Sequence, residues 1–175
     1  MISRSRYCRR RILGSRGAVQ LSWRVLRWSA TWPGFGSQVP RRALESASGR
    51  WSDAAAQNPD DPLGAVIGFY LSGDHREEKM DGCPIVALGS DAARQGPDVK
   101  AEFEAGVKAH LDVLGRFLAG TDDEASRDKA SRDKAMAILA TMVGAVTLSR
   151  VVNDPDLAQA LLDAAAEQVR DAAAA

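Results

Sequence analysis

Apolar residues recur at intervals of three and four positions through most of the chain after residue 42, a spacing that predicts amphipathic helices. Proline and glycine, often beside Asn or Asp, separate these segments. The pattern predicts six helices, at residues 43–57, 62–72, 85–95, 98–119, 135–152 and 155–172. No segment alternates as a strand does, so the predicted fold class is all-α, a helical bundle.

The helix that begins at Pro62 has the clearest signals. Asp61 is a predicted N-cap, and a proline at the first helical position removes no hydrogen bond that the helix would otherwise make. Apolar residues cover most of its circumference, which predicts a core helix. They are Leu63, Val66, Ile67, Phe69, Tyr70 and Leu71. The charged stretch 73–82 that follows is predicted to be a loop.

The last two predicted helices each carry an apolar stripe. One stripe consists of Met136, Leu139, Met142, Val143 and Val146, and the other is a narrow seam of Leu157, Leu161, Ala164, Ala165 and Gln168. The alanines of the seam allow another helix to approach closely. Before these helices the sequence Ala-Ser-Arg-Asp-Lys occurs twice, at 125–129 and 130–134. Five added residues rotate a helix by about 140° relative to its packing face, so the duplication is expected at an exposed helix start.

Charge and tryptophan divide the chain into two segments. Residues 1–50 contain eleven arginines and one acid, Glu45, whereas the remainder has twelve basic and twenty-two acidic residues. Trp23, Trp28 and Trp32 also lie in the first segment, among glycines and prolines that interrupt helices. We therefore expect residues 1–42 to form an irregular basic arm and residues 43–175 to form the folded domain.

The composition of the arm supports three interpretations. Arginines such as Arg9, Arg10 and Arg11 are suited to phosphate contacts. An acid-poor segment rich in Arg and Ser is also typical of an organelle transit peptide. The third interpretation, which we favour as a hypothesis, is that G+C-rich DNA encoding residues 14–42 is read out of frame.

The chain offers few side chains for catalysis or metal binding. His75 and His110 are far apart, and neither has a Cys, Asp or Glu at the spacing of a metal site. We expect His75 to be solvated in a loop and His110 to be partly buried. Cys83 precedes Pro84 at a helix start, where the helix dipole favours a thiolate, so a thiol-based sensor or enzyme is an alternative to a small space-filling residue. We predict no enzyme activity, no cofactor and no metal.

One set of motifs resembles a known family. Asp61-Pro62-Leu63, Phe69-Tyr70-Leu71-Ser72, His75-Arg76 and the run Gly-Cys-Pro-Ile-Val-Ala-Leu-Gly-Ser-Asp-Ala-Ala-Arg at 82–94 resemble the start of the C-terminal domain in one branch of the TetR/AcrR transcriptional regulators. The order of the later helices is similar as well, so the resemblance covers residues 43–172.

The resemblance implies a domain that binds a small apolar effector and forms a homodimer through its last two helices. The implied effector-binding residues are Phe69, Cys83, Leu88, Phe103, Val107 and His110. The implied dimer-interface residues are Leu139, Met142, Val143, Val146, Leu157, Leu161 and Ala165. Packing within a single chain is the alternative for each residue of both sets.

The DNA-binding half of that family consists of three helices with a helix-turn-helix. Residues 1–42 lack the apolar spacing of three helices, and a recognition helix needs a packed scaffold. Operator DNA is therefore an expected partner only where the N-terminal domain is intact, and no DNA-contacting residue is assigned. No apolar run approaches the roughly 18–20 residues of a bilayer span. Cys8 and Cys83 give no disulfide framework, so a reducing cytoplasm is the expected location. A helical binding protein imported into an organelle by its arginine-rich arm is the alternative.

Overall fold

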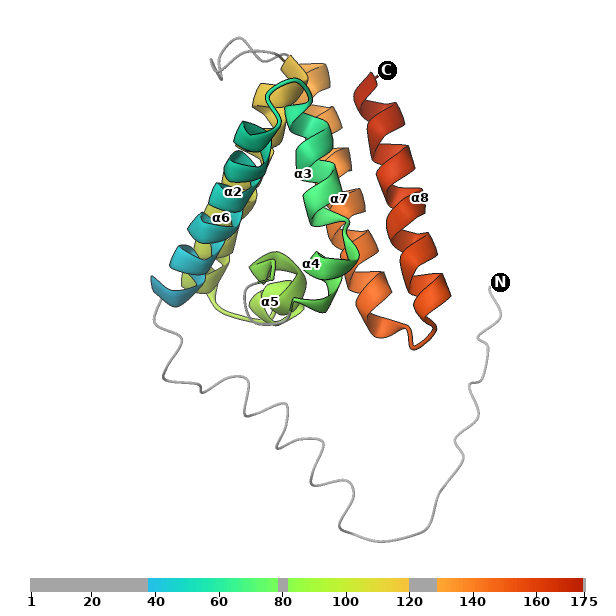
Figure 1. The fold of residues 1–175 in the computed structure, drawn as a ribbon. Coiled ribbons are helices and arrows are strands. Elements are labelled where there is room, and N and C mark those ends of the chain that lie inside the picture. Colours follow the sequence, from blue (N-terminus) through green and yellow to red (C-terminus); the bar gives the residue numbers. More distant parts are fainter. Residues whose placement is uncertain (1–37, 79–81, 120–128, 175) are drawn as a thin grey trace, which may run out of the picture. The chain divides into compact units, whose positions relative to one another are not determined.

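The structure is a computed structural model that describes residues 38–78, 82–119 and 129–174 (Figure 1). All described helices belong to the part of the chain from Phe35 onward. They are α2 (Gln38–Gln57), α3 (Pro62–Tyr70), α4 (Gly73–Glu77), α5 (Pro84–Ala92), α6 (Pro97–Ala119), α7 (Lys129–Val151) and α8 (Pro155–Ala174). The described residues contain no strand, which confirms the all-α class.

The helices form two packed groups. α2 and α6 run side by side, and α7 and α8 form an antiparallel pair (Figure 1). α3 packs against α2 and also contacts α6 and α8, while the short helices α4 and α5 close one end (Figure 1). In this arrangement the apolar stripes of α2, α3, α6, α7 and α8 face a shared interior.

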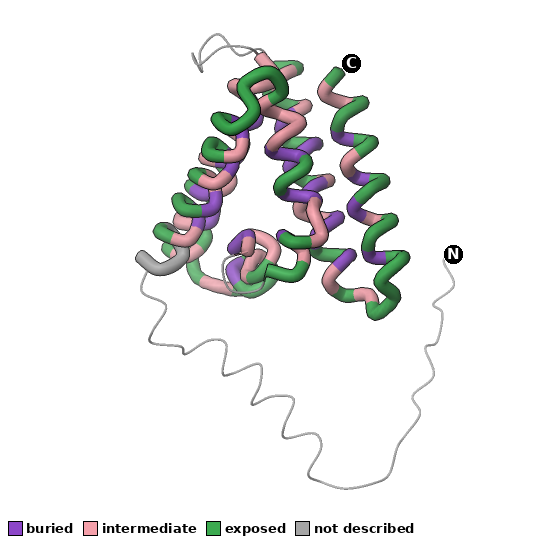
Figure 2. The backbone as a smooth tube through the Cα atoms, in the orientation of Figure 1, coloured by how far each residue is buried: buried purple, intermediate pink, exposed green. Residues whose placement is uncertain are grey.

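The interior contains two apolar clusters. The main cluster spans α2, α3, α6, α7 and α8, and its most completely buried members include Trp51, Ile67, Leu114, Met142 and Leu162. A smaller cluster of Leu44, Ala92 and Phe103, with Leu88 against it, joins α2, α5 and α6. Buried residues follow one side of each helix, as Figure 2 shows.

A glycine sets the distance between α2 and α6. A Cβ atom built on Gly106 would lie only 2.7 Å from both terminal methyl carbons of Leu44. Any larger residue at this position would have to push the two helices apart, because Leu44 is itself buried.

Several predicted boundaries are confirmed. Asp61 caps α3, since its carboxylate accepts a hydrogen bond from the Gly64 amide at 2.9 Å, and Pro62 is the first helical residue. Asp154 caps α8 by accepting from the Asp156 amide at 2.9 Å. The second copy of the duplicated pentapeptide lies in the first turns of α7, where Arg132 and Asp133 are exposed, as expected. The first copy, apart from Lys129, lies outside the described residues.

Two predictions about local structure are wrong. α2 begins at Gln38 rather than at residue 43, because Pro40 falls in its first turn, where backbone amides need no helical partner. The charged stretch after Ser72 is not all loop, since residues Gly73–Glu77 form α4. Ser72 caps this short helix by accepting from the His75 amide at 3.1 Å.

The predicted seam of α8 is one residue away from the observed one. The buried stripe consists of Ala158, Leu162, Ala165 and Val169. Of the predicted seam residues, Leu157, Ala164 and Gln168 are exposed, Leu161 is half-buried and Ala165 is buried. The inner stripe packs α8 on α7, and the predicted seam runs along its edge.

Candidate ligand-binding site

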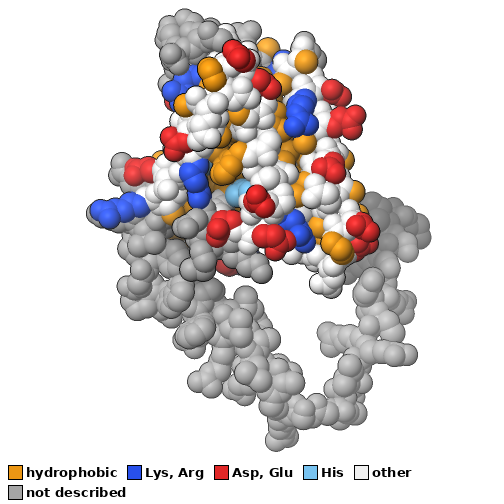
Figure 3. Space-filling model, in the orientation of Figure 1, with side chains coloured by type: hydrophobic (Ala, Val, Ile, Leu, Met, Phe, Trp, Pro, Cys, Tyr) orange, Lys and Arg blue, Asp and Glu red, His pale blue; other side chains and the backbone are white. Residues whose placement is uncertain are grey.

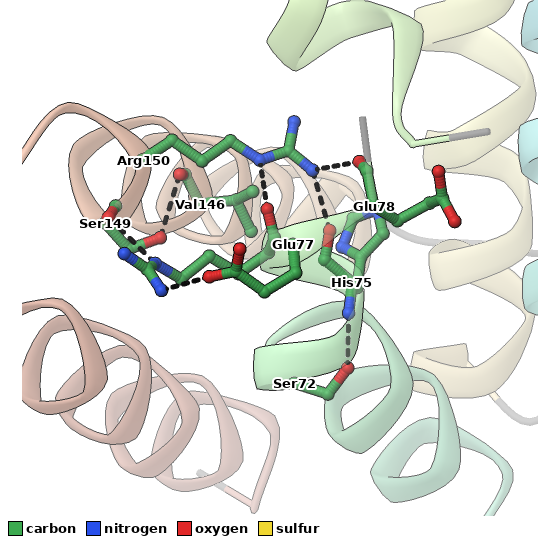
Figure 4. Close-up of polar contacts among 8 residues, drawn as sticks. Ser72, His75, Glu77, Glu78, Val146, Ser149 and Arg150 are labelled. Atoms are coloured by element: carbon green, nitrogen blue, oxygen red, sulfur yellow. Dashed lines mark hydrogen bonds and ion pairs between the residues drawn. The ribbon is translucent and has the colours of Figure 1, made fainter. Parts of the chain in front are cut away.

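Two arginines join α4 to the end of α7. Arg150 donates from Nη2 to the carbonyls of His75 (2.7 Å) and Glu78 (2.9 Å) and from Nε to the carbonyl of Arg76 (2.9 Å). In return, Arg76 donates from Nε to the Ser149 carbonyl at 2.9 Å (Figure 4). Each cation thus satisfies carbonyls at the C-terminal end of the other helix, where the helix dipole favours positive charge. This reciprocal pair of arginines holds the two helices together. We call the contact between α4 and the C-terminal end of α7 the joint.

His75 is part of this joint and is not a solvated loop residue. Its side chain is buried, and Nδ1 lies 2.7 Å from the Tyr70 carbonyl. Because a carbonyl can only accept, Nδ1 carries the proton. Burial lowers the pKa of His75 below its ordinary value of 6.5, and the charges of Arg150 and Arg50 act in the same direction. The prediction of a solvated His75 is wrong, because the ring packs against Phe69 and Tyr70 of α3.

The residues that carry the family resemblance also build this joint. A Cβ on Gly82 would lie 2.5 Å from the Glu78 carbonyl oxygen, so the position accepts only glycine. The Gly82 carbonyl accepts a long hydrogen bond from Arg50 at 3.4 Å. Cys83 is the N-cap of α5 without a side-chain capping bond, and Pro84 is the first helical residue. Packing and capping account for these residues in this chain.

A cluster of rings lies in the interior beside the joint. Trp51 of α2 contacts Tyr70 of α3 and His110 of α6, with ring centroids 5.2 and 4.6 Å apart, both in edge-to-face geometry. Tyr70 also contacts His75 at 4.6 Å. Trp51, Tyr70 and His110 are each at most 1% exposed. We call these three residues together with Cys83 the Trp51 cluster.

His110 presents a hydrogen-bond acceptor inside the protein. Its Nδ1 lies 2.7 Å from the Gly106 carbonyl, so Nδ1 is the donor and carries a proton. Burial, and to a smaller extent the charge of Arg50, lowers the pKa of His110, so the ring is neutral and Nε2 is a bare acceptor. Nε2 has no hydrogen-bond partner. The expected partial burial of His110 is wrong, because the ring is completely enclosed.

Tyr70 presents a donor in the same cluster. Burial and the neighbouring Cys83 raise the pKa of Tyr70 well above its ordinary value, so the hydroxyl keeps its proton. The hydroxyl lies beside the Cys83 thiol, and the interaction with this thiol contributes to the raised pKa, although the two groups do not reach hydrogen-bond geometry. Three buried side-chain polar atoms lack a partner among the described residues, and two of them, Tyr70 Oη and His110 Nε2, belong to this cluster. Unsatisfied polar groups in an interior are costly and mark sites for water or ligand.

The predicted effector-binding residues do not form one group. Cys83 and His110 lie at the Trp51 cluster, and Val107 packs on the main core. Leu88 and Phe103 belong to the smaller cluster. Phe69 is 36% exposed and stacks on His75 at 5.7 Å. The structure therefore brings together only part of the predicted set.

Sequence reasoning missed Trp51 and Tyr70 as site residues. The sequence pattern assigns Tyr70 to the core without indicating a polar role, and Trp51 falls in a predicted helix rich in Ala, Ser and Glu. A single large aromatic residue in such a helix is itself a signal, since it marks the face that turns inward.

Cys83 is buried at 3% exposure, which limits its access to oxidants. Among the described residues, no group of three or more His, Cys, Asp and Glu side chains is arranged to hold a metal ion. Neither observation points to a catalytic site among the described residues.

The predicted interface residues divide into buried and outward-facing ones. Leu139, Met142, Val146 and Ala165 are buried within the single chain, Val143 and Leu161 are half-buried, and Leu157 is 48% exposed. The buried four already pack α7 against its neighbours, as the single-chain alternative describes.

The outer side of α7 is uncharged over most of its length. Between Ala135 and Ser149, α7 has no charged residue. The surface of this stretch is therefore formed by uncharged side chains, which include Ala137, Ala140, Thr147 and Leu148. Asp163, Glu167 and Asp171 of α8 are exposed acids. Acidic side chains lie along the α8 side of the molecule in Figure 3. Large apolar residues exposed on the pair are Met136, Leu148, Val151 and Leu157.

By length and composition, α7 is apolar enough to cross a membrane, although core helices of other proteins meet the same criterion. This corrects the expectation that no segment approaches a span; Thr141 and Thr147 interrupt the run without adding charge. Among the described helices, no other meets the criterion.

Comparison with known proteins gives no match: no family model, no curated protein and no solved structure is similar enough to identify a relative. The likeness to TetR regulators therefore rests on the residues of the motif alone.

Proposed function

We propose that the chain is the effector-binding and dimerising part of a TetR-like transcriptional regulator, a binding protein rather than an enzyme. The observation that carries the proposal is the uncharged outer side of α7 between Ala135 and Ser149, beside which Leu157 of α8 is exposed. The Trp51 cluster supplies a second support, because its unpaired donor and acceptor suit a small molecule. DNA binding is proposed only for a chain with an intact N-terminal reader.

The two outer stripes of α7 and α8 complement one another. In an antiparallel pair, residues equally far from the connecting turn lie level, which sets Leu148 beside Leu157 and Gly144 beside Leu161. At 100° per residue, Thr141, Gly144 and Leu148 share one flank of α7, and Leu157, Leu161 and Ala164 share one flank of α8. These flanks combine leucines with small residues and carry no charge between residues 137 and 151 of α7 and between residues 157 and 168 of α8; Asp171 lies beyond that stretch on α8.

A second copy of the chain is the partner that fits this surface. An uncharged patch with no carboxylate or ammonium to satisfy matches itself across a twofold axis. Small residues at Gly144 and Ala164 let helices from two copies approach closely, and the leucines supply apolar area. The predicted interface thus keeps Leu157 and Leu161 and adds Gly144 and Leu148.

Sedimentation velocity of the full chain with and without Gly144→Leu tests the proposal. A Cβ at Gly144 meets no atom within 4 Å, so the substitution leaves the single chain intact but blocks a partner helix. Gly49→Leu is the matched control, because Gly49 is equally open on α2. We expect wild type and Gly49→Leu to dimerise at micromolar concentration and Gly144→Leu to dimerise at least about tenfold more weakly.

A wild-type chain that stays monomeric would contradict the proposal. Equal association of all three proteins would contradict it too, since the dimer would then use another surface. Association with neutral phospholipid vesicles in place of a dimer would assign the surface to a membrane and would also overturn it.

A further inference from the structure

We propose that α4 is an acid-released latch: protonation of His75 adds a positive charge beside Arg150 and Arg50, and this charge frees α4 from the end of α7. The inference is independent of the proposed dimer, because none of these three residues belongs to the proposed interface. It depends on the position of His75 in α4, on the charges that surround its ring, and on the small number of bonds that hold the helix.

His75 is the anchor of α4. Of the five residues in this helix, only His75 is buried. Its ring contacts Phe69 and Tyr70 at the end of α3, with ring centroids 5.7 and 4.6 Å apart. A single helical turn is not stable by itself in water, so its attachment depends on these contacts and on its hydrogen bonds. Burying an ionised side chain is costly, and histidine is the side chain whose charge changes near neutral pH. The residue that fixes α4 can therefore also release it.

The groups around the ring disfavour a second proton. Nδ1 carries the first proton and lies 2.7 Å from the Tyr70 carbonyl, so the second has to bind at Nε2. Arg150 of α7 and Arg50 of α2 face the ring, and Glu78 at the C-cap of α4 is the opposing acid. The phenol of Tyr70, in α3, stays neutral. Protonation thus brings a like charge next to Arg150, whose Nη2 lies 2.7 Å from the carbonyl of the same histidine.

Few bonds hold α4 to α7. Arg150 supplies three, to the carbonyls of residues 75, 76 and 78, and Arg76 supplies another by donating to the Ser149 carbonyl (Figure 4). Segments with few buried contacts open locally at a lower free-energy cost than the whole domain. α4 can therefore detach while α7 and α8 stay folded.

The direction of the pH effect follows from the two states of His75. Burial, Arg150 and Arg50 hold the pKa of the ring below 6.5 while α4 is bound, and release returns the pKa toward this ordinary value. The released state then binds more protons, so acid favours release as the pH falls below 6.5. One proton changes this equilibrium by at most about tenfold per pH unit.

Amide hydrogen exchange of the full chain, measured by NMR between pH 7.5 and pH 5 and corrected for the intrinsic exchange rate, tests the inference. The amides of Arg76 and Glu78, which form hydrogen bonds within the turn of α4, report on the latch. The amide of Leu162, a completely buried residue, reports on the domain. We expect the protection of Arg76 and Glu78 to fall at least about tenfold, while Leu162 at pH 5 stays at least about a hundredfold better protected than they are.

Three variants assign the response to His75. His75→Asn removes the titration but keeps a side-chain N–H near the place of Nδ1, so the protection of α4 should differ by less than about twofold between the two pH values. His110→Phe removes the other buried imidazole and should keep the full fall. Arg50→Gln removes one cation that disfavours the second proton, so the fall should become at least about twofold smaller. This last variant decides the matter if His75→Asn loses α4 at every pH.

Unchanged protection of Arg76 and Glu78 over the pH range would overturn the inference, as would a full fall in His75→Asn or in Arg50→Gln. A fall that vanishes in His110→Phe would assign the response to the other histidine and overturn it as well. Equal loss of protection at Leu162 and in α4 would show that acid unfolds the whole domain and that α4 is not a latch.

Discussion

Around α2, α3 and α6 the interior holds a tryptophan, a tyrosine and a histidine whose polar atoms include two without partners, whereas between α7 and α8 it is aliphatic. The buried hydroxyl of that second region, on Ser149, donates to the Val146 carbonyl at 2.9 Å. On the outside, α7 exposes an uncharged surface between Ala135 and Ser149. The first region therefore keeps two unpaired polar atoms, Tyr70 Oη and His110 Nε2, in its interior. In the second region the buried hydroxyl is paired, and the outer surface is the one that we propose as a dimer interface.

The aliphatic region should be the more sensitive to loss of volume. Leu162→Ala removes a completely buried side chain between α8 and the core, and we expect it to lower the free energy of unfolding by about 2–5 kcal/mol. Glu167→Ala, on the exposed flank of the same helix, should change it by less than about 0.5 kcal/mol. Urea denaturation measures both. A similar loss for the two variants would mean that α8 is not packed as described.

The joint between the two regions should depend on Arg150. Arg150→Met leaves three carbonyls of residues 75, 76 and 78 without their donor, at an expected cost of about 2 kcal/mol. Amide hydrogen exchange should become faster in α4 before the rest of the domain. Arg170→Met, an exposed arginine on α8, is the control. Unchanged exchange in α4 would show that the joint does not hold this helix.

The contact between α2 and α6 should depend on Gly106. Gly106→Ala places a Cβ against Leu44, and we expect a loss of about 1–3 kcal/mol. Gly49→Ala, where nothing lies within 4 Å, should instead stabilise the domain by up to about 1 kcal/mol through helix propensity. Opposite signs in thermal unfolding are the expected outcome. Two stabilising substitutions would contradict the close approach of the helices.

The smallest expected effect is a dependence on pH. Burial lowers the folded-state pKa of His75 and His110 below their ordinary value of 6.5. The unfolded chain therefore binds more protons, so stability is complete above pH 6.5 and decreases as the pH falls below it. His110→Phe should flatten this acid dependence in unfolding measurements between pH 5 and pH 7.5. An acid dependence identical to that of wild type would show that His110 is not held neutral.

The sequence predicted what local chemistry determines. Asp61-Pro62 and Asn153-Asp154-Pro155 located helix ends, because caps and prolines act within a few residues. The existence of α4 was not predictable, since its carbonyls are satisfied by Arg150, more than 70 residues away.

The misplaced seam of α8 has a similar cause. The stripe 157, 161, 164 and 168 and the stripe 158, 162, 165 and 169 are adjacent, and each consists mainly of leucine, alanine or valine. Periodicity gives both the same weight, and only the packing of α7 decides which one is buried. Likewise, the role of the Trp51 cluster depends on rings from three helices, and no local pattern joins them.

The outer surface of α7 and α8 carries the central claim, and solvent accessibility of leucine methyl groups tests it most directly. NMR relaxation by a soluble gadolinium agent can be compared for Leu148 and Leu157, which are about half exposed, and for Leu162, which is buried. We expect Leu148 and Leu157 to be accessible in dilute protein and protected at concentrations where the dimer forms, while Leu162 is protected throughout. If Leu148 and Leu157 stay accessible at every concentration, no second copy covers this surface and the account is contradicted.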